Sequence, residues 1–178
     1  MNRLMRLLFG SMIAVPVIFS GCYRVSNYTG DGQLIDNGAR AATDRYVLDL
    51  GSVDLTHRGT RTFRIANLPE VNFVVGFEIV APDNNNLIER KAASPTVSIE
   101  LASPDGKILF AKKAPLDAWT WAVRAGENRA FVYGREEPAT YFDAAPKTEY
   151  TLTLTVFEPD QKQSKYMVSL MAKSGGWK

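Results

Sequence analysis

Residues 150–156 read YTLTLTV, in which apolar and hydroxyl side chains alternate. Successive side chains of a β-strand point to opposite faces, so this pattern predicts a strand with one buried and one solvent-facing side. The buried side would carry Tyr150, Leu152, Leu154 and Val156, while the three threonines would face water. Such a strand is typical of an antiparallel sheet with one face on a hydrophobic core.

The same period of two recurs along the chain from residue 45 onward. Apolar side chains alternate with others near residues 46–50, 62–65, 73–79, 97–101 and 166–170. Between two such runs, Pro104-Asp105-Gly106 predicts a hairpin. Another turn signal, Glu158-Pro159-Asp160, begins the loop between the last two long strands. About eight strands favour an all-β fold, a single antiparallel β-sandwich, with jelly-roll and immunoglobulin-like orders both open.

The N-terminus has the order of a secretory signal. Arg3 and Arg6 precede an apolar run over residues 7–19, and the small residues Ser20 and Gly21 follow. This run is shorter than the roughly 20 residues that a spanning helix needs. Removing the signal leaves 21 − 2 = 19 basic and 19 acidic residues, a net charge of zero. A neutral mature chain gives no electrostatic reason to expect a nucleic-acid partner.

The segment Phe19-Ser20-Gly21-Cys22 resembles the lipobox of bacterial lipoproteins, although leucine is more usual where Phe19 stands. The resemblance covers residues 1–22 and implies that Cys22 is lipidated, with cleavage before it and acylation of its new amine. Several acyl chains anchor a protein stably, whereas one chain binds marginally. Tyr23 follows the cysteine where aspartate would favour the inner membrane. By that analogy the protein is held to the outer membrane, facing the periplasm, with the lipid bilayer as its partner through Cys22.

Residues 23–44 are rich in Gly, Asn, Asp, Ser and Thr and show no lasting apolar period. This composition predicts a flexible linker with a reach of about 25 Å. The expected organisation is therefore a signal peptide over residues 1–21, a lipidated cysteine and tether over 22–44, and a β-sandwich domain over 45–178.

The residues that usually carry catalysis are scarce. His57 is the only histidine, so a Ser-His-Asp or Cys-His set would need it, and it lies in a predicted turn where we expect a solvated side chain. Zinc sites favour several His or Cys ligands, and neither residues 83–86 nor Glu136-Glu137 have the spacing of a calcium loop. We therefore expect no catalytic residues, no metal site and no cofactor. Glycoside hydrolysis by two carboxylates stays open, because sequence does not give their separation.

The region over residues 119–137 is the candidate binding region. Alternation places both indoles of Trp119-Thr120-Trp121 on one strand face, where they either fill the core or form an aromatic platform. Aromatic and arginine residues dominate binding hot spots. The candidate partner-binding residues are Trp119, Trp121, Arg124, Arg129, Tyr133 and Arg135.

These observations favour a non-enzymatic protein-binding module on a lipid tether. One version is an immunity protein that captures a toxin entering the periplasm. Two alternatives are a structural accessory of an envelope or secretion assembly and a glycan-binding module that uses Trp119 and Trp121. In the first two cases the expected partner is a periplasmic protein.

Overall fold

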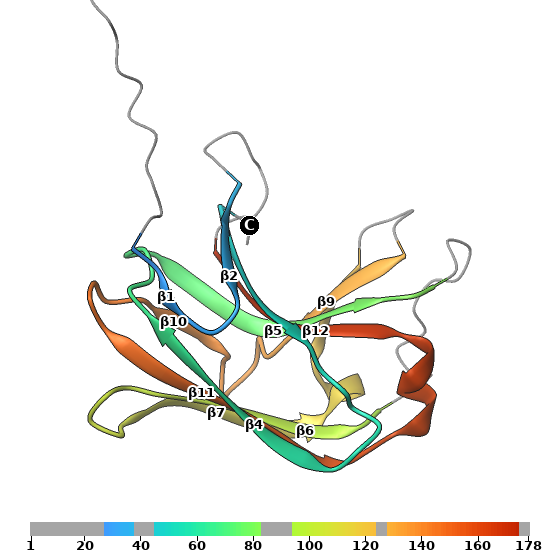
Figure 1. Cartoon of the computed structure of the whole chain (residues 1–178). Coiled ribbons are helices and arrows are strands. Elements are labelled where there is room, and N and C mark those ends of the chain that lie inside the picture. Colours follow the sequence, from blue (N-terminus) through green and yellow to red (C-terminus); the bar gives the residue numbers. More distant parts are fainter. Residues whose placement is uncertain (1–26, 38–44, 83–93, 124–127, 175–178) are drawn as a thin grey trace, which may run out of the picture.

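The computed structural model describes residues 27–37, 45–82, 94–123 and 128–174 (Figure 1). These residues form twelve β-strands and two short 3-10 helices, η1 (Leu116–Ala118) and η2 (Gln161–Lys165). The strands make two antiparallel sheets that pack against each other, which confirms the predicted β-sandwich. None of the helices in the described ranges is long and apolar enough to cross a membrane. The predicted signal and Cys22 lie outside those ranges.

The two sheets differ in size. The five-stranded sheet runs in the order β1 (Thr29–Gly30), β4 (Gly59–Ala66), β11 (Glu149–Glu158), β6 (Thr96–Ala102), β7 (Ile108–Pro115). The seven-stranded sheet runs in the order β2 (Gln33–Asp36), β3 (Tyr46–Ser52), β12 (Met167–Ser174), β5 (Asn72–Val80), β9 (Arg129–Tyr133), β8 (Thr120–Val123). The strand β10 (Tyr141–Asp143) pairs with the beginning of β5.

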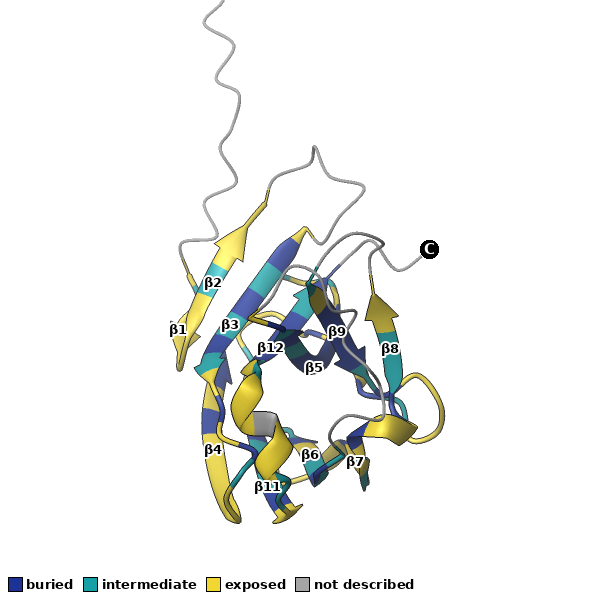
Figure 2. Cartoon of the chain, turned by 90° about the vertical axis from the view of Figure 1, so that its right-hand side faces the viewer, coloured by how far each residue is buried: buried dark blue, intermediate teal, exposed yellow. Residues whose placement is uncertain are grey.

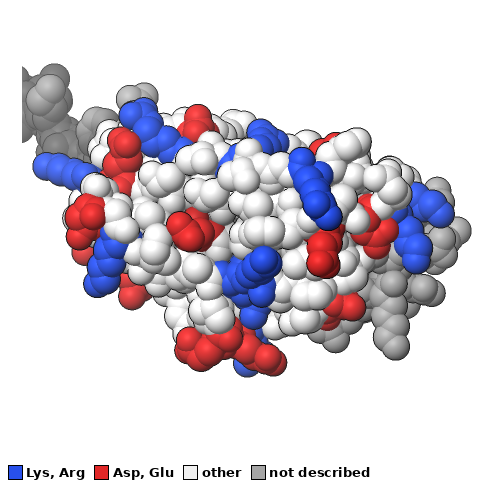
Figure 3. All heavy atoms as spheres, turned by 90° about the horizontal axis from the view of Figure 1, so that it is seen from below, with Lys and Arg blue, Asp and Glu red and all other residues white. Residues whose placement is uncertain are grey.

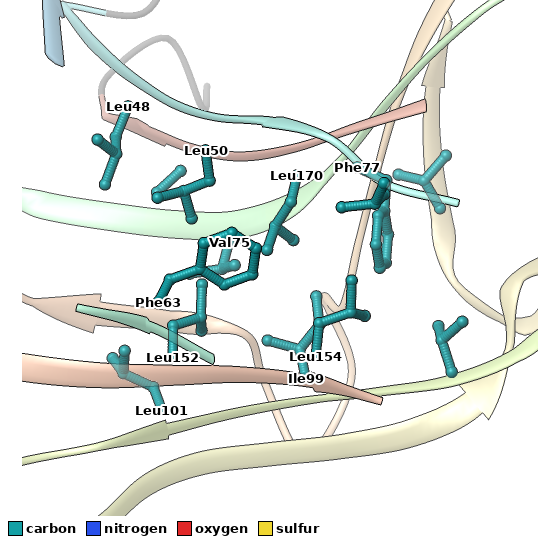
Figure 4. Close-up of a cluster of buried hydrophobic side chains, with 14 of the residues drawn as sticks. Leu48, Leu50, Phe63, Val75, Phe77, Ile99, Leu101, Leu152, Leu154 and Leu170 are labelled. Carbon is teal, nitrogen blue, oxygen red and sulfur yellow. The ribbon is translucent and has the colours of Figure 1, made fainter. Parts of the chain in front are cut away.

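The core lies between the sheets and is built by the alternation that the sequence shows. In β11 the apolar residues from Tyr150 to Val156 are buried and the intervening threonines are half-buried or exposed. Figure 4 shows Leu48, Val75 and Leu170 of one sheet pointing toward Leu152 and Ile99 of the other. Figure 2 shows the same division as buried and less buried residues that alternate along strands such as β3. Each fully buried side chain of this size contributes about 1.5–3 kcal/mol to folding.

The predicted hairpin after β6 is present. Ser103 N donates to the carbonyl oxygen of Lys107 at 2.9 Å, which closes the turn between β6 and β7. Gly106, with φ of 80°, follows Asp105 in that turn. The predicted loop after Glu158 is also present and contains η2 before β12 begins.

The predicted tether is not wholly a linker, because part of it belongs to the sheets. Within residues 22–44, β1 pairs with β4 and β2 pairs with β3, so this segment adds an edge strand to each sheet. Tyr28 and Leu34 are half-buried against the core. Gly32 has φ of +78°, and a Cβ there would collide with the carbonyl oxygen of Asp49. The folded body therefore begins by residue 27 rather than at residue 45.

Candidate functional site

Both tryptophans of the candidate region turn toward the core. Trp119 directly follows η1 and is 1% exposed, with its ring 5.6 Å from that of Phe77 between centroids. Trp121 in β8 pairs with the inward residue Val132 and is half-buried, and its Nε1 donates to the carbonyl oxygen of Leu116 at 2.9 Å. Core packing therefore accounts for Trp119, which corrects the expectation that it belongs to a binding surface. A glycan platform made of both indoles would need Trp119 to be exposed, and it is not.

The other candidate residues lie at the two ends of β9 or beyond it. Arg129 begins β9 and is exposed, and Tyr133 ends β9 and is half-buried. Both point to the outward face of the seven-stranded sheet, because Ala130 and Val132 between them face the core. Arg135 is exposed in the connection to β10, whereas Arg124 lies outside the described residues.

The outward side of the seven-stranded sheet carries a second apolar cluster. Val74 of β5, Phe131 of β9 and Met171 of β12 are buried there although they face away from the core, and two half-buried residues, Val47 and Tyr133, pack on them. The register brings these strands side by side: Gly76 pairs with Tyr133 on one side and with Met171 on the other. We call this surface the β9–β5–β12 face, made of Val47, Val74, Glu78, Arg129, Phe131, Tyr133, Met171 and Lys173.

Two aromatic rings lie flat together on this face. The rings of Phe131 and Tyr133 are 5.6 Å apart between centroids and only 19° from parallel. Gly76 makes room for them, because a Cβ at this position would collide with the carbonyl oxygen of Val132 and press on the Phe131 ring. The residue of β5 that lies beside the aromatic pair is thus one without a side chain. Such pairs contribute about 0.5–1.5 kcal/mol beyond their buried area.

Charged side chains surround the aromatic pair. Glu78 accepts a hydrogen bond from Lys173 Nζ at 3.2 Å, and its Oε1 lies 3.8 Å from Arg129 Nη1. Lys173 Nζ also lies 4.5 Å from the centroid of the Phe131 ring. The side chains of Glu78 and Lys173 are 16% and 12% exposed, so water screens their attraction less than at an open surface. The face therefore combines aromatic area with partly desolvated charge of both signs.

The outward face of the five-stranded sheet is different in chemistry. It is rich in small hydroxyl side chains, and Thr60 Oγ1 and Thr155 Oγ1 of neighbouring strands are 3.1 Å apart. Figure 3, which views this side, shows positive and negative residues scattered among neutral ones. Phe157 places an aromatic ring on this side, and Lys113 Nζ lies 3.6 Å from the centroid of that ring. This face exposes Leu109 and Phe157, but its other outward side chains are mainly hydroxyl and charged groups. We therefore take the β9–β5–β12 face, with its packed aromatic and charged cluster, as the better candidate for binding.

Sequence reasoning identified Arg129 and Tyr133 but missed their neighbours on the face. Phe131 is an outward aromatic residue between the inward residues Ala130 and Val132. The alternation within residues 129–133 could therefore have identified it as a neighbour of Arg129 and Tyr133 on the same face. For Val74 the signal is weaker, since residues 73–77 of β5 read FVVGF and carry no polar side chain on either face. Lys173 and Met171 come together with it only through the pairing of β12 with β5.

His57 lies in the turn between β3 and β4, as expected, and its side chain is 77% exposed. Its Nδ1 is 2.8 Å from Asp54 Oδ2 and 2.9 Å from Thr56 Oγ1. A Ser-His-Asp arrangement needs the carboxylate and the hydroxyl on different ring nitrogens. Here both partners meet the same nitrogen, so the geometry is that of a turn and not of a nucleophile and its base.

A hollow of about 330 Å³ lies where β10 pairs with β5, lined by Glu70, Val71, Asn72 and residues 143–146. Asn72 Nδ2 donates to Asp143 Oδ1 at 3.1 Å, and both residues line this hollow. Among the described residues, no three His, Cys, Asp or Glu side chains are grouped so as to hold a metal ion.

Comparisons with known proteins give likeness of shape only. The sequence matches no protein-family model and no curated protein. A crystal structure of a protein from Sulfurospirillum deleyianum has a TM-score of 0.46 and 8% sequence identity, over 72% of this chain and 97% of that one. The crystal structure of the infectious bursal disease virus VP2 subviral particle has a TM-score of 0.32 and 14% identity, over 85% of this chain and 34% of that one. At these TM-scores and identities, neither likeness bears on what this chain binds.

Proposed function

We propose that the protein is a lipid-anchored, non-enzymatic binding module of the outer membrane, facing the periplasm, which contacts a protein partner through its β9–β5–β12 face. The resemblance of residues 19–22 to a lipobox supports the anchor. The single observation that carries the binding role is the aromatic and charged cluster on the outward side of the seven-stranded sheet. An outward sheet face that served only solubility would resemble the hydroxyl-rich face of the other sheet.

A protein partner fits this face better than a glycan does. Glycan platforms use exposed ring faces, whereas Phe131 is 6% exposed and stacks on Tyr133. The residue types are those of protein interfaces, where tyrosine and arginine are enriched at the positions that carry most of the affinity. Arg129 and Tyr133 lie on the face itself, and Tyr141, which pairs with Val74, extends it at 52% exposure. A periplasmic toxin or an envelope assembly component would each be such a partner.

The test compares the two outward faces of one protein. A photo-crosslinking amino acid replaces Tyr133 or Tyr141 on the β9–β5–β12 face and, as a matched control, Thr62 on the five-stranded sheet, in cells that make the lipidated protein. We expect a discrete protein adduct from the first two positions and none from Thr62. Adducts of the same size from all three positions, or from Thr62 alone, would contradict the proposal.

The partner identified by its adduct then allows a measurement of affinity. Tyr133→Ala should lower affinity by about thirtyfold, the equivalent of about 2 kcal/mol at a hot spot. Thr62→Ala should leave the affinity unchanged. Melting temperatures of both variants show whether a loss of binding reflects a loss of folding.

A further inference from the structure

The first described residues enter the sandwich at one of its two ends. Thr29 pairs with Ala66, the last residue of β4, which in turn pairs with Glu149, the first residue of β11. We call this the hairpin end, because the turn between β6 and β7 lies there too. At the opposite end β4 begins and β11 ends, and η2 follows; we call it the η2 end. Figure 1 shows the hairpin end on the left and η2 on the right.

The start of the folded body is fixed firmly at the hairpin end. Asp31 N donates to the carbonyl oxygen of Arg64, and Arg64 N donates to Asp31 Oδ2, both at 2.7 Å. Asn67 Nδ2 donates to Thr29 Oγ1 at 2.9 Å, and the Tyr28 hydroxyl donates to the carbonyl oxygen of Asp31. Residues 28–31 therefore move with the sandwich and do not act as a free tether.

Chain length then limits where the bilayer can be. Five residues of chain lead from Cys22 to Asn27, and a fully extended chain of this length spans at most about 18 Å. The ten residues of β11, which run from one end of the sandwich to the other, span about 33 Å. A bilayer at the η2 end would thus lie too far from Asn27 for the short chain to bridge.

We infer that the hairpin end faces the lipid bilayer and that the η2 end points into the periplasm, an orientation that rests on the proposed lipidation of Cys22. The loops of the η2 end are then presented away from the membrane, and hydrogen bonds hold them together. Asp160 N donates to the carbonyl oxygen of Leu55 at 3.2 Å, and Ser94 N donates to Asp160 Oδ2 at 3.0 Å. The β9–β5–β12 face is a side of the sandwich and not one of its ends. A partner bound to it would therefore lie next to the sandwich, above the membrane surface.

The two ends of β11 provide a matched pair of reporters. Glu149 and Glu158 are both exposed. Glu149 accepts a hydrogen bond from Arg64 Nη1 at 3.3 Å, and Glu158 accepts one from Thr96 Oγ1 at 2.8 Å. Glu149→Cys and Glu158→Cys are each labelled with a maleimide donor dye in the mature acylated protein, whose native thiol is held in a thioether. The protein is placed in vesicles of phosphatidylethanolamine and phosphatidylglycerol that carry an acceptor dye on a lipid headgroup.

We expect the donor at position 149 to lose more fluorescence to the acceptor than the donor at position 158. Inserting twenty Gly and Ser residues between positions 26 and 27 gives a reach of about 25 Å and should remove most of that difference. Equal or reversed losses without the insertion, in protein bound to vesicles, would overturn the orientation alone. Protein that does not bind vesicles, and whose Cys22 reacts with the maleimide, would overturn the proposed anchor and the orientation with it.

Discussion

Asp54 shows how a short turn can shift the titration of one exposed carboxyl group. Hydrogen bonds from the Thr56 hydroxyl and backbone N–H, and then from His57, lower the pKa of Asp54 from 3.8 to about 2. A folded-state pKa below the unfolded value means that the interaction stabilises the fold above about pH 4 and is lost as the pH falls toward 2.

We predict that Thr56→Ala raises the pKa of Asp54 toward 3.8, because it removes the largest cause of the shift and keeps the backbone donor. A carbon-13 NMR titration of the Asp54 carboxyl in the folded domain measures this. Thr62→Ala, which removes a hydroxyl from a sheet face remote from this turn, is the control. A pKa of Asp54 that is the same in Thr56→Ala and in the unchanged protein would show that the hydroxyl is not its cause.

Trp119 and Trp121 are two residues apart and differ in burial. We therefore predict that their substitution by alanine lowers the free energy of unfolding by different amounts. Trp119→Ala should lower the free energy of unfolding by about 3–5 kcal/mol, because it empties a buried site beside Phe77. Trp121→Ala should cost less, since its side chain is half-buried at the edge strand β8. Urea unfolding of both variants, followed by circular dichroism, gives the two values. A smaller loss for Trp119 than for Trp121 would contradict the observed packing.

The pair of strands β1 and β2 is the element that departs most from its sequence pattern. Its residues are mostly exposed and polar, so no period of two marks them, and their strand form comes from pairing with β4 and β3. Composition alone could identify the segment only as a linker. By contrast, β3, β6 and β11 each bury one face, and their alternation was sufficient to predict them.

We predict that a chain beginning at residue 45 is less stable than one beginning at residue 27, because the shorter chain leaves the outer edges of β3 and β4 without partners. A single substitution tests the same element. Gly32→Ala should destabilise by more than about 1 kcal/mol, since it combines a positive φ with a collision against Asp49.

Gly106→Ala is the matched control for that substitution. Its φ of +80° is close to that of Gly32, but an added Cβ would meet nothing within 4 Å. Urea midpoints of the two alanine variants therefore separate the collision from the backbone strain. Equal losses would mean that the collision of the added Cβ with Asp49 costs nothing beyond the backbone strain.

The whole molecule presents two outward faces of opposite character, and sequence alone could predict only one of them. The threonines of β11 predict a solvent-facing side of the sheet, because each lies between buried residues of the same strand. The β9–β5–β12 face is assembled from three strands that are distant in the sequence, and residues 73–77 of β5 carry no polar side chain on either side. Arg129 and Tyr133 were predictable as candidates from their residue types. Their position beside Val74, Met171 and Lys173 was not predictable, because it depends on how the strands pair.

If lipid on Cys22 serves only to attach the molecule, then attachment and folding should separate cleanly. The two sheets are built from residues between Thr29 and Ser174, and Cys22 lies outside the described residues. We predict that Cys22→Ser yields an unacylated, uncleaved precursor, while its sandwich keeps the strand signature of the mature protein in circular dichroism. Ser20→Ala, which keeps a small side chain before the cleavage site, is the matched control and should be acylated and cleaved as before. Mass spectrometry of the N-terminal peptide from membrane fractions distinguishes the two variants. A mature N-terminus at a residue other than 22, or unchanged acylation in Cys22→Ser, would remove the anchor from the proposed function and leave the binding face as a separate question.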